Sequence, residues 1–135
     1  MTEKELSNYF YLKREAEDLE ERLATLGYGV AAIQPKELNI SSNKQKSSIQ
    51  EKITQLKEIW IEKRVKALEE YIKIEKYIGS IEDIEIRTIM RYRYLDLKRW
   101  DEIGDLLHYD RTSPSKKMRT YLKNHNSHNS HSDLV

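Results

Sequence analysis

Cysteine is absent from the chain, and glycine and proline occur only 4 and 2 times in 135 residues. The absence of cysteine excludes disulfides, zinc sites built on thiolates and cysteine nucleophiles, and it fits a reducing compartment. No apolar run approaches the length of about 20 residues that spans a bilayer. The opening residues 1–5 are not followed by an apolar signal core. We therefore expect a soluble intracellular protein with no membrane partner.

Motifs of catalysis are absent as well. The sequence has no glycine-rich phosphate loop, no nucleophile elbow and no His/Glu metal pair on a helix. His125, His128 and His131 are spaced by three residues, but Asn and Ser surround them and few other metal-ligating side chains lie nearby. We expect no enzyme activity, no cofactor and no physiological metal site.

Charge is abundant but unevenly distributed. Hydrophobic residues make up 38% of the chain and charged residues 35%, a balance typical of long, exposed helices. Residues 1–79 contain 14 basic and 14 acidic residues, whereas Arg111 to Lys123 contains five basic residues and no acidic one. A local positive excess of this kind is the footprint of a nucleic-acid-binding surface.

The first 79 residues predict a coiled-coil-like helical hairpin. Apolar residues at alternating spacings of three and four predict a helix from Glu3 to Leu26, with Thr2 and Glu5 as its capping box. This apolar seam is made of Tyr9, Leu12, Ala16, Leu19, Leu23 and Leu26. Gly27 and Gly29 end the helix, and a flexible loop is expected at 27–47.

A second, longer helix is predicted from Ser48 to Ile78, with Ser48 and Glu51 as its capping box and Gly79 as a left-handed C-terminal residue. Two apolar stripes run along it. One contains Ile49, Ile53, Leu56, Trp60, Ala67, Tyr71, Ile74 and Ile78, and the other contains Ile61, Val65, Leu68 and Ile72. The first helix can cover only part of this surface, so another copy of the chain or the C-terminal domain is expected to cover the rest. The uncovered stripe leads us to expect a homodimer.

Residues 80–123 predict a trihelical helix-turn-helix domain. Its first helix begins with Ser80 as N-cap and runs to about Leu95. A short helix from Trp100 to Leu107, a turn at His108 to Thr112 and a last helix to Lys123 follow. The residues expected to pack this motif are Trp100, Ile103, Gly104, Leu107, Tyr109, Met118 and Leu122. Residues 124–135 are expected to form a disordered tail.

The last helix carries the expected DNA contacts. Asp110, Thr112 and Ser113 are each suited to be its N-cap. Its N-terminal residues should meet base edges, while Lys117, Arg119 and Lys123 should meet phosphates. The full set of predicted DNA-binding residues is Arg111, Thr112, Ser113, Ser115, Lys116, Lys117, Arg119 and Lys123.

The stretch from Asp83 to Lys123 resembles a known family. The residues that carry the resemblance are Ile86-Arg87, Arg91-Tyr92-Arg93-Tyr94-Leu95, Trp100-Asp101-Glu102-Ile103-Gly104, Tyr109-Asp110-Arg111-Thr112-Ser113 and Ser115-Lys116-Lys117. They are similar to region 4 of bacterial sigma factors and to the phage-encoded, sigma-like late-transcription regulators of the ArpU and RinA type. Pro114 and His108 depart from that pattern. The resemblance implies promoter binding near phage late genes, together with host RNA polymerase, in the cytoplasm of the bacterial host.

The sequence thus predicts an all-α protein that binds double-stranded DNA as a dimer and regulates the transcription of a phage or prophage. Two alternatives remain. One is a DNA-packaging recognition subunit of the small-terminase kind, which also joins a helix-turn-helix to oligomerising helices. The other is a protein-interaction module that binds RNA polymerase or a host factor without DNA.

Overall fold

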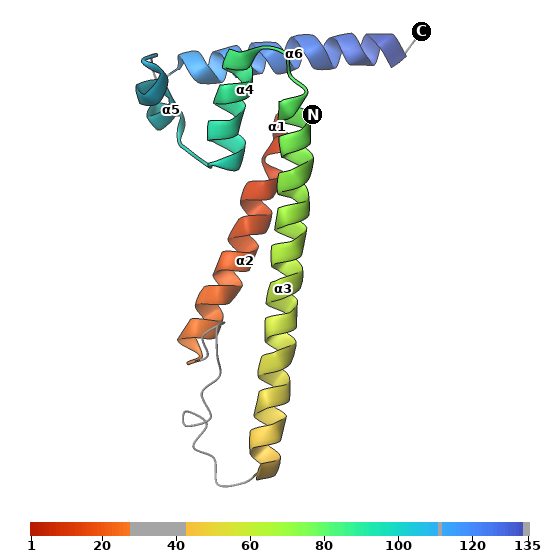
Figure 1. The fold of residues 1–135 in the computed structure, drawn as a ribbon, viewed down its shortest axis with the longest axis vertical. Helices are drawn as coiled ribbons and strands as arrows, with labels where there is room; N and C mark the ends of the chain where they lie inside the picture. Colours follow the sequence, from red (N-terminus) through yellow and green to blue (C-terminus); the bar gives the residue numbers. More distant parts are fainter. Residues whose placement is uncertain (28–42, 111, 134–135) are drawn as a thin grey trace. The chain divides into compact units, whose positions relative to one another are not determined.

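The computed structural model describes residues 1–27, 43–110 and 112–133, with the backbone alone for 43–47 and 127–133. Every element in these ranges is helical, which confirms the predicted all-α class. The elements are α1 (Glu3–Leu6), α2 (Asn8–Thr25), α3 (Asn43–Gly79), α4 (Ile84–Met90), the π-helical turn η2 (Arg91–Leu95), α5 (Trp100–Leu107) and α6 (Ser113–Asp133) (Figure 1). None of the described helices is long and apolar enough to cross a membrane.

The chain forms two compact units. The terminal unit combines Met1–Tyr11 with Leu68–Val135, and the hairpin unit is Leu12–Ala67. This division differs from the predicted one between residues 79 and 80. The beginning of the chain belongs to the terminal unit because Leu6 is fully buried in that unit's core.

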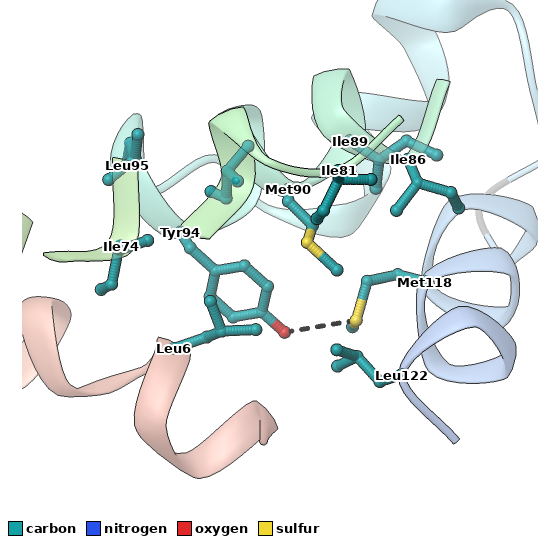
Figure 2. Close-up of a cluster of buried hydrophobic side chains, with 11 residues drawn as sticks. Leu6, Ile74, Ile81, Ile86, Ile89, Met90, Tyr94, Leu95, Met118 and Leu122 are labelled. Carbon is teal, nitrogen blue, oxygen red and sulfur yellow. Dashed lines mark hydrogen bonds between the residues drawn. The ribbon is translucent and has the colours of Figure 1, made fainter. Parts of the chain in front are cut away.

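The terminal unit has a dense apolar core. Figure 2 shows Leu6 from α1 and Ile74 from α3 in the same cluster as Met118 and Leu122 from α6. The hydroxyl of the buried Tyr94 donates to Met118 Sδ at 3.7 Å, so its polar atom has a partner within the core. Both α4 and α5 pack against α6, which fixes the position of that helix within the unit.

The hairpin unit pairs the later part of α2 with the earlier part of α3 (Figure 1). Its buried apolar residues are Ala16, Leu23, Ile53 and Ala67. Lys63 Nζ lies 3.4 Å from Glu15 Oε2 across the two helices. Within the described residues of this unit, two of the four buried side chains are alanines, and fewer large side chains are buried than in the terminal unit.

At the N-terminus, the predicted cap of the first helix is present, but the helix is not continuous. Thr2 Oγ1 accepts from the Glu5 N–H at 3.2 Å, as the capping pattern predicted. The predicted single helix is interrupted at Ser7, whose hydroxyl donates to the Glu3 carbonyl at 2.9 Å. A hydroxyl that bonds back to the preceding turn competes with regular helix geometry, and the two helices meet at this residue.

The long helix α3 starts earlier than predicted. It begins at Asn43, so the predicted capping box at Ser48 is wrong and Ser48 lies inside the helix. No Gly or Pro lies between Asn43 and Ser48, and the Lys and Gln residues there favour helix. The rest of the predicted loop, 28–42, falls outside the described residues. The prediction for Gly79 is also wrong, because this glycine does not adopt a positive φ.

Asp83, and not Ser80, caps α4. The Asp83 carboxylate accepts from the Glu85 N–H at 2.9 Å and from the Ile86 N–H at 3.3 Å. The Ser80 hydroxyl donates instead to the Tyr77 carbonyl at 2.6 Å. A carboxylate at the start of a helix is also favoured by the helix dipole.

The last helix is longer than predicted. It continues past Lys123 to Asp133, where the sequence had predicted a disordered tail. No Gly or Pro follows Pro114, so no helix-breaking residue interrupts it. The His125 ring stacks on Tyr121 with centroids 3.8 Å apart, and His125 Nδ1 lies 2.9 Å from the Tyr121 carbonyl.

Candidate nucleic-acid interface

The turn between α5 and α6 depends on His108. This residue ends α5 in the left-handed conformation, with φ 60° and ψ 40°. The next N–H, that of Tyr109, donates to the Gly104 carbonyl at 2.8 Å. Glycine adopts this conformation without strain, whereas a residue with a Cβ does so at a cost. His108 therefore adopts the left-handed backbone conformation that a glycine would adopt at this turn.

The hydrogen bonds at the start of α6 fix its frame. The helix begins at Ser113, and the Lys116 N–H donates to the Thr112 carbonyl at 3.1 Å. Thr112 therefore occupies the N-cap position among the three candidates. Pro114 falls at the second helical position, where its missing N–H removes no bond within the helix. Its ring is fully buried, so Pro114 supplies core packing.

One face of α6 packs on the domain. Met118 and Leu122 are buried, as are Ile103 and Gly104 of α5, while Trp100, Leu107 and Tyr109 are partly buried. Ser115 belongs to the same buried face, and its hydroxyl donates to the Thr112 carbonyl at 3.1 Å. The structure therefore does not bring Ser115 to the surface with the other predicted DNA-binding residues.

The opposite face of α6 presents a basic row, which we define as Thr112, Lys116, Thr120 and Lys123. All four side chains are exposed. Their spacings of four, four and three residues place them one above the other on a helix. Ser113 lies beside this row and is half-buried. Thr120 was missed from the sequence, although its spacing from Lys116 and Lys123 would have identified it.

Lys117 lies at one edge of this face and is held by two groups. Its Nζ lies 2.7 Å from Glu85 Oε1, and the Tyr109 hydroxyl donates to Glu85 Oε2 at 2.9 Å. The same Nζ lies 4.6 Å from the centre of the Tyr109 ring. The hydrogen bonds from Lys117 and then Tyr109 lower the pKa of Glu85, and the hydrogen bond to Glu85 raises the pKa of Lys117.

Arg119 lies at the other edge of the exposed face. Its Nε is 3.2 Å from Glu3 Oε1 on α1. The same helix is tied to the start of the chain a second time, because Asn126 Nδ2 donates to the Met1 carbonyl at 3.2 Å. Glu3 is separated from Arg119 by 116 positions in sequence, so sequence spacing did not predict this pair.

The surface of α5 has the opposite charge. Arg99 Nε lies 3.3 Å from Asp101 Oδ1 and 3.0 Å from Glu102 Oε1, and Asp105 is exposed. An anion would therefore be attracted to the face of α6 and repelled from α5. Among the predicted DNA-binding residues, Arg111 lies outside the described residues.

The described residues hold no cluster of three or more potential metal ligands. Of the three evenly spaced histidines, His128 and His131 lie where side chains are not described. Comparison with protein-family models, curated proteins and solved structures found no match to this chain.

Proposed function

We propose that this protein binds double-stranded DNA through α6 and regulates transcription. The observation that carries the proposal is the basic row, an exposed line of two lysines and two threonines on α6. We propose that α5 and α6 act together as a helix-turn-helix, with α6 as its second helix. Lysine and threonine bond to phosphates and to acceptors on base edges. A helix of this kind fits the major groove with its apolar face turned towards its own domain.

The roles within α6 follow from its frame. Thr112 and Lys116 lie at the N-terminal end, which in such motifs meets base edges, and the free N–H groups there favour a phosphate. Thr120 lies one turn further along and would read a neighbouring base or phosphate. Lys123 lies further from the start of the helix and would contact the backbone.

The proposed purpose is control of late genes in a phage or prophage, together with host RNA polymerase in the bacterial cytoplasm. It rests on the resemblance of residues 83–123 to sigma region 4 and to sigma-like phage regulators. Arg91, one of the matching residues, makes a two-point contact to Glu75, with Nη2 2.9 Å from Oε1 and Nε 3.4 Å from Oε2. In this protein that arginine therefore supports the domain and is not part of the basic row.

We further propose that the active form is a homodimer that pairs through α3. The predicted second stripe is exposed in each unit: Ile61 and Val65 of the hairpin unit are 52% and 46% exposed, and Leu68 and Ile72 of the terminal unit are each 53% exposed. A second copy of the same stripe would remove these side chains from water. A dimer would carry two basic rows and would favour a DNA site with two half-sites.

The test is a binding experiment on fragments of the genome that encodes the protein. The wild type is compared with Lys116→Ala and with Lys52→Ala, a matched exposed lysine on α3. We expect one retained fragment, weakened by salt and by Lys116→Ala but not by Lys52→Ala. A fragment from the packaging region and a ring-sized mass would instead favour the terminase alternative. No preference among fragments would favour the protein-interaction module.

A further inference from the structure

The basic row is bordered on both sides by cations that are already paired. Lys117 is held by Glu85 on α4, and Arg119 is held by Glu3 on α1. These carboxylates come from different helices, and each reaches towards α6 from its own side. The centre of the face differs, since within the described part of the chain neither Lys116 nor Lys123 has an ion-pair partner.

The pairing changes how much positive charge DNA would meet. A carboxylate within about 3 Å of a lysine or arginine cancels most of its field at longer range, and it repels a phosphate that approaches the same cation. Binding of a phosphate by Lys117 or Arg119 would have to displace the carboxylate. The cations at the two edges therefore attract phosphates less than the formal charge of residues 111–123 indicates.

The Glu85–Lys117 pair has more contacts than the Glu3–Arg119 pair. Its carboxylate uses both oxygens, one for Lys117 and one for the Tyr109 hydroxyl, and the tyrosine ring lies against the lysine ammonium. Tyr109 is half-buried and directly follows His108 in the turn between α5 and α6. The Glu3 pair has one contact and joins two exposed side chains.

From this arrangement we infer that Glu85 and Glu3 are specificity-determining residues, which hold Lys117 and Arg119 away from DNA and limit sequence-independent attraction to phosphates. The inference rests on the proposed DNA binding. It reverses the roles that the sequence predicted for Lys117 and Arg119 as phosphate contacts. In the bound state the two pairs persist, and discrimination between sequences depends on the basic row.

The test measures binding to a random-sequence duplex and to the retained fragment as a function of salt. Glu85→Gln and Glu3→Gln each free one cation, and Glu69→Gln removes an exposed carboxylate elsewhere on α3 with the same change in net charge. Each freed cation should steepen the slope of log K against log salt by about 0.9. Between about 50 and 200 mM salt, the loss of affinity should then grow about 3.5-fold for each variant.

We expect both variants to bind the random duplex more tightly at low salt, with Glu85→Gln and Glu3→Gln additive and Glu69→Gln close to wild type. Lys117→Gln in the Glu85→Gln background should restore the wild-type slope. The inference is overturned if the slopes stay unchanged while circular dichroism shows an intact fold. If neither wild type nor any variant binds DNA, the proposed function fails instead, so the two failures are distinguishable.

Discussion

The two units of this protein use their apolar residues differently. The terminal unit buries large side chains such as Ile74, Ile89, Met90 and Met118 completely. The hairpin unit buries Leu23 and Ile53 with two alanines, and it leaves Ile59, Ile61 and Val65 exposed. The comparison teaches that the terminal unit is held by large, fully buried side chains, whereas the described part of the hairpin unit buries few. Both units keep apolar surface on α3 exposed, since Leu68 and Ile72 of the terminal unit are each 53% exposed.

Matched substitutions on α3 test this comparison most directly. Ile74 is fully buried in the terminal unit, and Ile53 is 4% exposed in the hairpin unit. Ile74→Ala should lower the free energy of unfolding by about 2–5 kcal/mol because dense surroundings cannot collapse into the cavity. Ile53→Ala should cost less than about 2 kcal/mol, since its sparse surroundings relax more easily. Urea titration measures both, and a larger cost at Ile53 would refute the comparison.

The next test concerns the exposed stripe of α3. Ile72→Glu places a charge in the proposed dimer interface, where it would lose its hydration. We expect the dimer to weaken at least about 100-fold, which corresponds to about 2.7 kcal/mol. Ile84→Glu is the matched control, because Ile84 is 68% exposed on α4 and lies off the stripe. Sedimentation at high micromolar concentration distinguishes them. A wild type that is monomeric there would remove the dimer from the proposal.

Some features of the fold follow from local patterns in the sequence. The first predicted stripe of α3 contains eight residues, of which four are buried: Ile53, Ala67, Ile74 and Ile78. The other four are partly buried: Ile49, Leu56, Trp60 and Tyr71. The same reasoning failed at Leu26 and Ile84, which are 61% and 68% exposed although both fit an apolar spacing. Periodicity identifies one side of a helix, but it does not say whether a neighbour covers that side along its whole length.

The candidate site was less predictable than the helices that carry it. Lys116 and Lys123 could be assigned to the exposed face of α6 because a helix repeats every 3.6 residues. The pairs that Lys117 and Arg119 make depend on Glu85 and Glu3, which tertiary packing brings to α6 from 32 and 116 positions away. No local sequence pattern predicts contacts between residues that are so far apart in the sequence. The burial of Ser115 was missed, although its spacings of three and seven residues from Met118 and Leu122 place it on their buried face.

A smaller effect is expected at the turn between α5 and α6, where the terminal unit has a non-glycine residue at positive φ. His108 is exposed, so His108→Gly removes the left-handed strain and loses little packing. The relief of backbone strain outweighs the added entropy of the unfolded chain. We therefore expect the free energy of unfolding to rise by about 0.5–1 kcal/mol. His108→Ala keeps a Cβ and should give no gain. Thermal unfolding measures both, and equal stability of the two variants would contradict the explanation.

The smallest expected effect compares the surface ion pairs of the two units. The lowered pKa of Glu85, caused first by its hydrogen bond from Lys117, means that its ionised form is favoured by folding. Its contribution to stability is therefore present above the ordinary pKa of 4.5 and is lost as pH falls through the lower folded-state value. Glu85→Gln should destabilise the protein at neutral pH, and this difference should vanish in acid. Glu15→Gln in the hairpin unit should change stability less, because Lys63 Nζ is 3.4 Å from Glu15 Oε2 where Lys117 Nζ is 2.7 Å from Glu85 Oε1. Urea titrations from neutral pH to below the ordinary pKa of 4.5 measure the stability of both variants. Equal losses of stability in Glu85→Gln and Glu15→Gln at neutral pH would refute the comparison.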